Sequence, residues 1–205
     1  MVIAIDGPAG AGKSTVARAA AAALGFTYLD TGAMYRCVAL AAPEGSAAEA
    51  ARTVAIELGD RVRLDGEDVT EAIRTPAVTG RASEVAADPE VRAALVEQQQ
   101  AIVATGDWVA EGRDIALVVA PDAAVKVFLT ASEQERARRR AAQTGADEAT
   151  VLAEQRERDA RDATGQRSIS EPAPDAVPVD TTGLSLEQVV EQIVTLATEA
   201  REIEG

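Results

Sequence analysis

Histidine is absent from the 205 residues of this chain, and cysteine occurs once, as Cys37. Without histidine, the chain lacks the side chain that serves most often as a general base and as a metal ligand. With a single cysteine, no intrachain disulfide can form, which is typical of a protein in a reducing compartment. We therefore expect a cytoplasmic protein whose chemistry depends on neither imidazole nor disulfides.

Aromatic residues and long apolar runs are also scarce. Aromatic side chains make up 2% of the chain against 47% hydrophobic residues, so a core must be built mainly from Ala, Val, Leu and Ile. No stretch approaches the roughly 18 apolar residues of a membrane span, and the apolar run Val2–Ile5 is too short for a signal peptide. We expect no membrane partner.

The charge balance is acidic: 34 acidic and 20 basic residues give a formal net charge of −14. Such a chain is expected to repel nucleic acids and anionic membranes. An anionic substrate would need a local cluster of basic residues.

A phosphate-binding pattern, G-x-x-x-x-G-K-[ST], directly follows the first apolar run. It comprises Gly7, Pro8, Ala9, Gly10, Ala11, Gly12, Lys13 and Ser14, with Thr15 after it. Glycines let backbone N–H groups surround a triphosphate, Lys13 can reach its β and γ oxygens, and the Ser14 hydroxyl can bind Mg²⁺. The alternative is a glycine-rich turn that binds nothing. The pattern favours ATP or a related nucleotide with Mg²⁺.

Short apolar runs alternate with helical stretches. A helix is predicted over Lys13–Leu24, ended by Gly25, and another through Met34 and Leu40. The expected strands are Val2–Ile5, Phe26–Leu29, Trp108–Ala110, Val125–Leu129 and Ala176–Val179, the last at a sheet edge because of Pro178. We predict an α/β fold: a five-stranded parallel sheet of the P-loop NTPase type, with helices on both faces.

The pattern changes between residues 43 and 105. There we expect a helix, a short strand Arg61–Leu64, an Asp65-Gly66 turn and two helices, the second capped by Asp88. We interpret this region as an insertion that binds substrate, within a core of residues 1–42 and 106–205 that carries a helical lid at about 133–165. Ser185 and Gln188 form a capping box that predicts the start of a final helix.

A phosphate-binding loop alone fits GTPases, motors, DNA-dependent ATPases and small-molecule kinases, but no N-K-x-D tetrapeptide for guanine is present. Two further motifs narrow the choice: Asp30-Thr31-Gly32-Ala33-Met34-Tyr35-Arg36 and Glu111-Gly112-Arg113-Asp114. Together, in this order, they resemble the bacterial cytidylate kinases, nucleoside monophosphate kinases of pyrimidine metabolism. The resemblance covers nearly the whole chain.

The resemblance implies roles for individual residues. Arg36, Arg113 and Thr31 would bind the acceptor phosphate, and Arg139 of the lid would meet the ATP phosphates, so Lys13, Arg113 and Arg139 would be catalytic. Ser83, Arg92 and Asp114 would bind cytosine, and Arg158 and Asp162 would bind the rest of the nucleotide, with Asp162 at the sugar. Ser83 could equally lie on a solvated helix face, and Arg158 and Asp162 could form a plain intrahelical ion pair.

The chain departs from the family pattern at two positions. Ala116 stands where family members usually have glycine, and Gly165 stands where an arginine is expected. We hypothesise that Arg167, two positions later, supplies the missing charge. The alternative is that Arg167 is solvated and that Arg36 and Arg113 suffice.

The function implied is transfer of the ATP γ-phosphoryl group to CMP, and to dCMP as well, with Mg²⁺ as cofactor. The alternatives are a kinase for UMP, AMP or a small alcohol, and a nucleotide-dependent switch without an acceptor. We also expect a monomer, because no long heptad pattern is present.

Overall fold

The computed structural model describes residues 1–42, 44–164 and 172–204, and the chain divides into two compact units. The first comprises Met1–Tyr28 and Asp107–Gly205, and the second Leu29–Gly106. The second unit begins earlier than the insertion expected from residue 43, because it includes the helix that follows Asp30.

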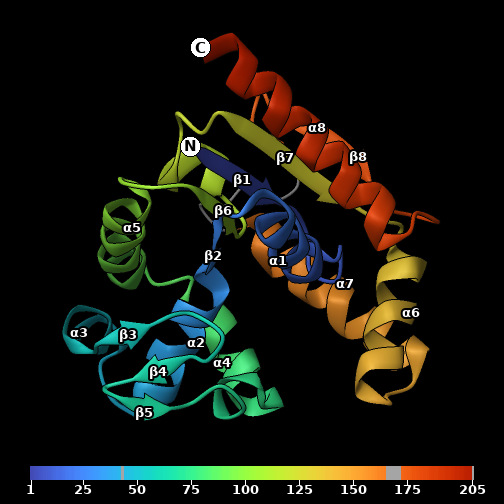
Figure 1. Ribbon diagram of the computed structural model, residues 1–205. Coiled ribbons are helices and arrows are strands. Elements are labelled where there is room, and N and C mark those ends of the chain that lie inside the picture. Colours follow the sequence, from blue (N-terminus) through green and yellow to red (C-terminus); the bar gives the residue numbers. More distant parts are fainter. Residues whose placement is uncertain (43, 165–171, 205) are drawn as a thin grey trace. The chain divides into compact units, whose positions relative to one another are not determined.

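Four strands of the first unit, together with a strand that runs from the first unit into the second, form a five-stranded sheet (Figure 1). Its order is β2-β6-β1-β7-β8, with bounds β1 Val2–Asp6, β2 Thr27–Asp30, β6 Trp108–Glu111, β7 Val125–Thr130 and β8 Val177–Asp180. Strand β1 pairs in parallel with both β6 and β7, and its residues Ile3–Ile5 are fully buried. The five predicted strands are confirmed to within one or two residues, and Pro178 does lie in an edge strand.

Helix α1 (Lys13–Leu24) packs against α8 (Leu186–Glu204) over the sheet. Small residues of α1, Ala17, Ala20 and Ala21, permit this close packing. As predicted, α1 ends at Gly25, which adopts a left-handed conformation, and α8 begins with the Ser185–Gln188 capping box. The expected lid region holds α6 (Glu133–Thr144) and α7 (Glu148–Thr164), which pack on each other.

The second unit is mainly helical. Its helices are α2 (Thr31–Ala41), α3 (Ala47–Thr53), η1 (Ala72–Arg74), α4 (Pro76–Val85) and α5 (Pro89–Val103). Fully or nearly fully buried apolar residues such as Met34, Val38 and Leu95 form one of its clusters. Asp88 caps α5 by accepting a hydrogen bond from the backbone of Glu90, as the sequence predicted.

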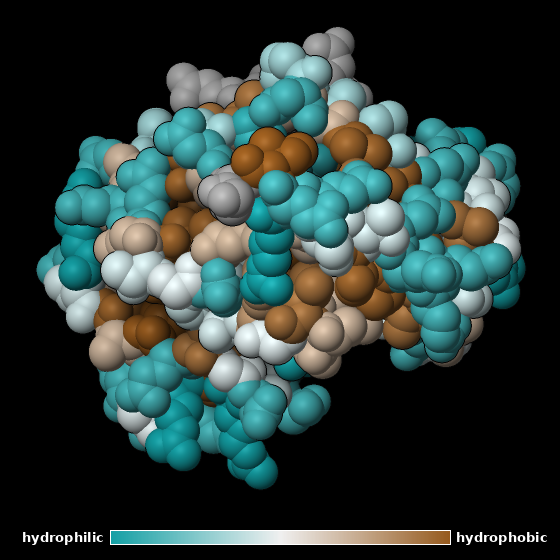
Figure 2. Space-filling model, turned by 45° about the horizontal axis from the view of Figure 1, so that its top comes forward, coloured by the Kyte–Doolittle hydropathy of each residue, from teal (hydrophilic) through white to brown (hydrophobic). Residues whose placement is uncertain are grey.

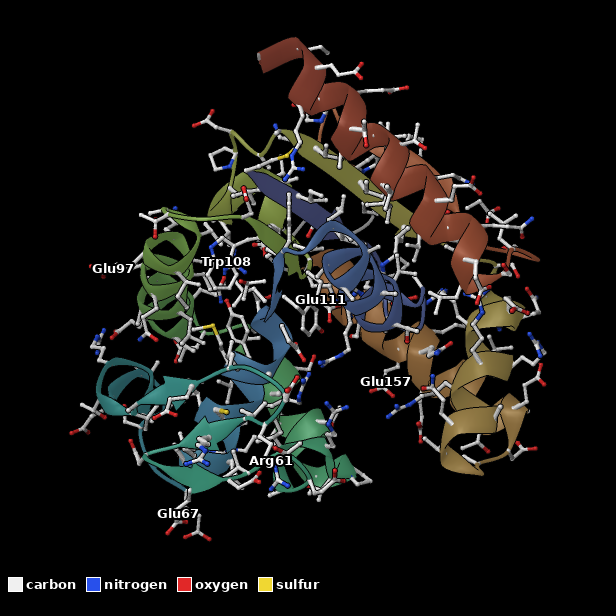
Figure 3. The ribbon with its side chains drawn as sticks, viewed as in Figure 1. Arg61, Glu67, Glu97, Trp108, Glu111 and Glu157 are labelled. Carbon is white, nitrogen blue, oxygen red and sulfur yellow. The ribbon has the colours of Figure 1, made fainter. Side chains whose placement is uncertain are left out.

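Of the single strand predicted over Arg61–Leu64, only Arg63–Leu64 is a strand, and two neighbouring strands were not predicted. The unit holds an antiparallel sheet of β3 (Ile56–Glu57), β4 (Arg63–Leu64) and β5 (Glu67–Asp68), with Arg61 and Glu67 labelled in Figure 3. Strands of two residues are too short to show an alternating pattern. The Asp65-Gly66 turn was correct: both residues have positive φ, as tight hairpins require.

The visible face in Figure 2 is largely hydrophilic, with hydrophobic side chains interspersed. Among residues 1–42, 44–164 and 172–204, no helix has the length and apolar character needed to cross a membrane.

Candidate active site

The loop between β1 and α1 depends on glycine at two positions. Gly7 has φ of 147°, and a Cβ atom there would lie 2.1 Å from the carbonyl oxygen of Leu129 in β7. Gly10 has φ of 78°, and a Cβ atom would lie 2.8 Å from Nε2 of Gln155. The loop backbone is therefore held closely against β7 and α7, in a conformation that side chains at these positions would prevent.

The first turn of α1 is open to an anionic ligand. Its N-cap is Gly12, which has no capping side chain, and Ser14 and Thr15 are exposed at the helix start. The Lys13 ammonium group donates a hydrogen bond to the carbonyl oxygen of Pro8 at 2.9 Å, which directs it back over the loop. Backbone N–H groups and the helix dipole make such a terminus favourable for phosphate.

Two arginines from separate segments of the first unit, Arg113 and Arg139, lie at the loop. Nη1 of Arg113 lies 3.4 Å from the carbonyl oxygen of Gly7. Arg139 lies near Gly12, where an added Cβ atom would be 3.7 Å from its Nη1, and it donates hydrogen bonds to Thr181 and Glu135. Lys13, Arg113 and Arg139, predicted from separate parts of the sequence, thus gather at one loop.

Arg136 is a loop contact that sequence reasoning missed. Its side chain is buried, donates to the carbonyl oxygen of Ala9 at 2.8 Å and pairs with Asp159 of α7 at 2.8 Å. The sequence indicated only a charged helix there, because nothing in the local pattern shows that α7 covers this position.

Asp6, the last residue of β1, is a second residue that the sequence analysis missed. It is 5% exposed, and its two carboxylate oxygens accept hydrogen bonds from the backbone N–H groups of Ile115 and Ala116 at 2.8 and 2.9 Å. Both residues belong to the short π-helical segment η2 (Ile115–Val119). Ala116, where the family pattern has glycine, is buried there, and its N–H group makes one of these bonds. The sequence does carry one signal for this residue, namely an acidic side chain at the end of the buried apolar strand β1.

Burial raises the pKa of Asp6 from 3.8 to about 6; the two backbone hydrogen bonds and Lys13 oppose this rise, and Asp114 adds to it. A carboxyl group with a raised folded pKa stabilises the fold below its unfolded pKa and loses that contribution as pH rises through the folded pKa. We expect a loss on the order of 3 kcal/mol between pH 4 and pH 7. Urea unfolding of the parent and of Asp6→Asn across this range measures it. Parallel pH profiles would contradict the assignment.

Glu111 ends β6 beside α1, where Figure 3 labels it. Its buried carboxylate accepts a hydrogen bond from the Tyr28 hydroxyl, and the Arg18 guanidinium lies 4.5 Å from the centre of the Tyr28 ring. Tyr28 therefore fixes the carboxylate at the end of a central strand, where ligands gather in open α/β sheets.

In the second unit, Asp30 and Arg36 form an ion pair at 2.9 Å. Asp30 also caps α2 by accepting from the backbone of Ala33. A Cβ atom at Gly32 would lie 3.1 Å from Nη1 of Arg36 and 3.2 Å from Oδ1 of Asp30, so glycine leaves room for this pair. Thr31 is buried at the first position of α2.

For the remaining predicted site residues, the structure gives mainly their position in the fold. Ser83 on α4 and Arg92 on α5 are half-buried in the second unit, and Asp114 is half-buried at the N-cap of η2 in the first. Arg158 and Asp162 lie within α7. Arg167 and Gly165 lie outside the described residues.

A parallel sheet with a phosphate-binding loop between its central strand and α1, and with arginines around that loop, defines a P-loop nucleotide kinase. The family model for cytidylate kinase matches residues 3–199. The chain belongs to the cytidylate kinase family, and it is an enzyme of the nucleoside monophosphate kinase class.

Relatives and a solved structure agree with this membership. The chain is 50% identical to cytidylate kinase of Desulfitobacterium hafniense, covering 95% of this chain and 91% of the relative. It is 48% identical to cytidylate kinase of Pelotomaculum thermopropionicum, covering 97% and 96%. A gluconokinase structure from Sinorhizobium meliloti matches with a TM-score of 0.55 and 20% identity over 99% of this chain and 95% of that one, which indicates a shared fold.

Proposed function

We propose that this enzyme transfers the γ-phosphoryl group of ATP to CMP, giving CDP and ADP, and that it also accepts dCMP. The main support for this proposal is that Lys13, Arg113 and Arg139 all lie at the Gly7–Thr15 loop in a member of the cytidylate kinase family. A nucleotide-dependent switch without an acceptor would not need these additional arginines next to the loop.

The donor site would be the loop itself. Backbone N–H groups of Gly7–Thr15 would hold the ATP phosphates, and Lys13 would contact the β and γ oxygens. The exposed Ser14 hydroxyl at the start of α1 suits Mg²⁺, which takes few protein ligands beside substrate phosphates. Glu111 would hold water around the ion. Bound there, Mg²⁺ would neutralise charge on the phosphates.

The acceptor phosphate would be bound by Arg36, Arg113 and the Thr31 hydroxyl. Planar guanidinium groups suit phosphate because they donate two parallel hydrogen bonds. The Asp30–Arg36 pair supports this role, since Asp30 holds the guanidinium in a fixed orientation at the start of α2.

The cytosine base would lie against Ser83, Arg92 and Asp114. Serine and arginine can donate to the acceptor edge of the pyrimidine, and a carboxylate can accept from its exocyclic amine. Asp162 would accept from the sugar, Arg158 would contact the nucleotide, and Arg167 would supply the charge absent at Gly165.

The reaction needs no histidine. The second pKa of a phosphate monoester is about 6, so the attacking oxygen of CMP is already ionised at neutral pH. That oxygen forms the new bond to the γ-phosphorus, and the bond from this phosphorus to the bridging oxygen of ADP breaks. Catalysis then consists of alignment and of charge neutralisation by Lys13, Arg113 and Arg139.

We further propose that the enzyme acts as a monomer in the cytoplasm, without nucleic-acid or membrane partners. The net charge of −14 supports the last two points, because it opposes binding to polyanions.

An ADP-release assay with CMP, dCMP, UMP, AMP and no acceptor tests the proposal. We expect rapid release with CMP and dCMP, and little with the others. Preference for UMP or AMP would indicate another nucleoside monophosphate kinase, and equal release without an acceptor would indicate an ATPase.

Asp114→Asn tests base recognition. The substitution replaces an acceptor that would face an amine present in cytosine and absent from uracil, so kcat/KM should fall more for CMP than for UMP. We expect the ratio of the two to drop by about 5- to 150-fold, corresponding to about 1–3 kcal/mol for one specific polar contact. Steady-state kinetics with both acceptors measures it. An unchanged ratio would show that Asp114 does not contact the base.

A further inference from the structure

Asp6 connects two segments that are far apart in the sequence. It is the last residue of β1, directly before Gly7, and its carboxylate binds the N–H groups of Ile115 and Ala116. Those residues directly follow Arg113 and Asp114. A single buried side chain thus joins the start of the phosphate-binding loop to the segment that bears two proposed acceptor-binding residues.

A second contact connects the same segments in the opposite direction. Nη1 of Arg113 lies 3.4 Å from the carbonyl oxygen of Gly7, the residue after Asp6. The N–H group of Gly112 also donates to the carbonyl oxygen of Ile5 at 3.1 Å. The loop and the 112–116 segment therefore form one hydrogen-bonded unit in which Asp6 supplies the only carboxylate among these contacts.

We propose that Asp6 is a positioning residue, which sets the place of Arg113 and Asp114 relative to the phosphate-binding loop and hence the distance between the donor and acceptor phosphates. The inference rests on the proposed function, because it takes Arg113 and Asp114 as contacts of the acceptor nucleotide.

The loop and the start of η2 differ in how much they depend on the Asp6 carboxylate for their position. Strand β1 pairs with β6 and β7 along its length, and Gly7 packs directly against the backbone of Leu129. The loop therefore keeps its place without the Asp6 carboxylate. The start of η2 depends on that carboxylate for two of its N–H groups. Loss of the carboxylate should displace the acceptor side and spare the ATP side.

Two substitutions of Asp6 separate positioning from simple hydrogen-bond satisfaction. Asp6→Asn keeps one acceptor oxygen and places an NH₂ group against the other N–H. Asp6→Glu keeps both acceptor oxygens but moves them outward by one methylene, so it could satisfy the N–H groups while shifting the segment. Ile193→Ala is the control: the apolar side chain of this fully buried residue of α8 makes none of the hydrogen bonds of the connection, and its truncation destabilises the fold through a cavity.

The measurements are kcat and KM for CMP at saturating ATP, the Kd of a non-hydrolysable ATP analogue, and the folded fraction by circular dichroism. We expect both Asp6 variants to lower kcat/KM for CMP by about 100-fold, the effect of a displacement near 1 Å, with the Kd of the ATP analogue nearly unchanged. The Ile193→Ala variant should keep parental kinetics where it is folded.

Several results would overturn the proposal. Parental kinetics in a folded Asp6→Glu variant would assign Asp6 to hydrogen-bond satisfaction alone. Equal losses for CMP and the ATP analogue would assign it to the loop, and loss of the folded state in both variants would assign it to stability. If the parent itself does not phosphorylate CMP, the proposed function fails; if it does and Asp6→Asn matches it, only this inference fails.

Discussion

Replacing Lys13 by alanine is expected to lower kcat by about 1,000-fold while leaving the fold intact. In the structure the Lys13 ammonium group is directed over the loop through its hydrogen bond to Pro8. A cation there stabilises charge on the transferring phosphoryl group mainly in the transition state, so its loss affects the rate more than binding. Single-turnover kinetics, with enzyme in excess over ATP and with saturating CMP, measures the chemical step directly.

Lys126→Ala is the matched control, since Lys126 is the other lysine of the chain. It lies in β7, pairs with Asp175 at 2.5 Å and has no proposed part in the reaction. We expect its kcat to stay close to that of the parent. Near-parental turnover of a folded Lys13→Ala variant would remove Lys13 from the mechanism.

Gly7→Ala should have the largest effect on stability. A methyl group at this position would meet the backbone carbonyl oxygen of Leu129 at 2.1 Å; that oxygen belongs to β7, and Gly7 directly follows β1. Relief of that contact requires movement of β1 or β7. We expect the free energy of unfolding to fall by about 4 kcal/mol or more, in the range reserved for severe steric conflict.

Gly25→Ala separates steric conflict from backbone conformation. Gly25 also has a positive φ, of 69°, but no atom lies within 4 Å of the Cβ that would be added. Its substitution should therefore incur only the left-handed backbone penalty of about 1–2 kcal/mol. Urea unfolding of both variants gives the comparison. Equal losses would mean that the loop does not pack on β7 as described.

The elements that the sequence predicted well are those with strong local signals. Strand β1 is a continuous apolar run, α1 is followed by Gly25, and α5 and α8 begin at capping residues. The strands β3 and β5 were missed because a strand of two residues is too short to show an alternating pattern. Both form through pairing with β4, β5 across the Asp65-Gly66 turn and β3 across residues 58–62, and such pairing is a property of the folded unit.

The candidate site shows the same division. The loop residues and Arg113 could be predicted because each belongs to a contiguous motif. Asp6 stands out as an acidic residue at the end of an apolar strand, but the roles of Asp6 and Arg136 could not be predicted, because they depend on partners more than 20 residues away in sequence: Ile115 for Asp6, and Ala9 and Asp159 for Arg136. A charged residue is normally exposed, so the sequence alone favours a solvated side chain at both positions.

Transfer of a labelled phosphate distinguishes CMP phosphorylation from ATP hydrolysis. The enzyme is incubated with ATP labelled at the γ position, Mg²⁺ and CMP, and the labelled products are separated. We expect the label to appear in the β-phosphate of CDP, with little inorganic phosphate, and the Lys13→Ala variant to form about 1,000-fold less per unit time. Label recovered as inorganic phosphate, or label that stays in ATP when CMP is the acceptor, would contradict phosphoryl transfer to CMP.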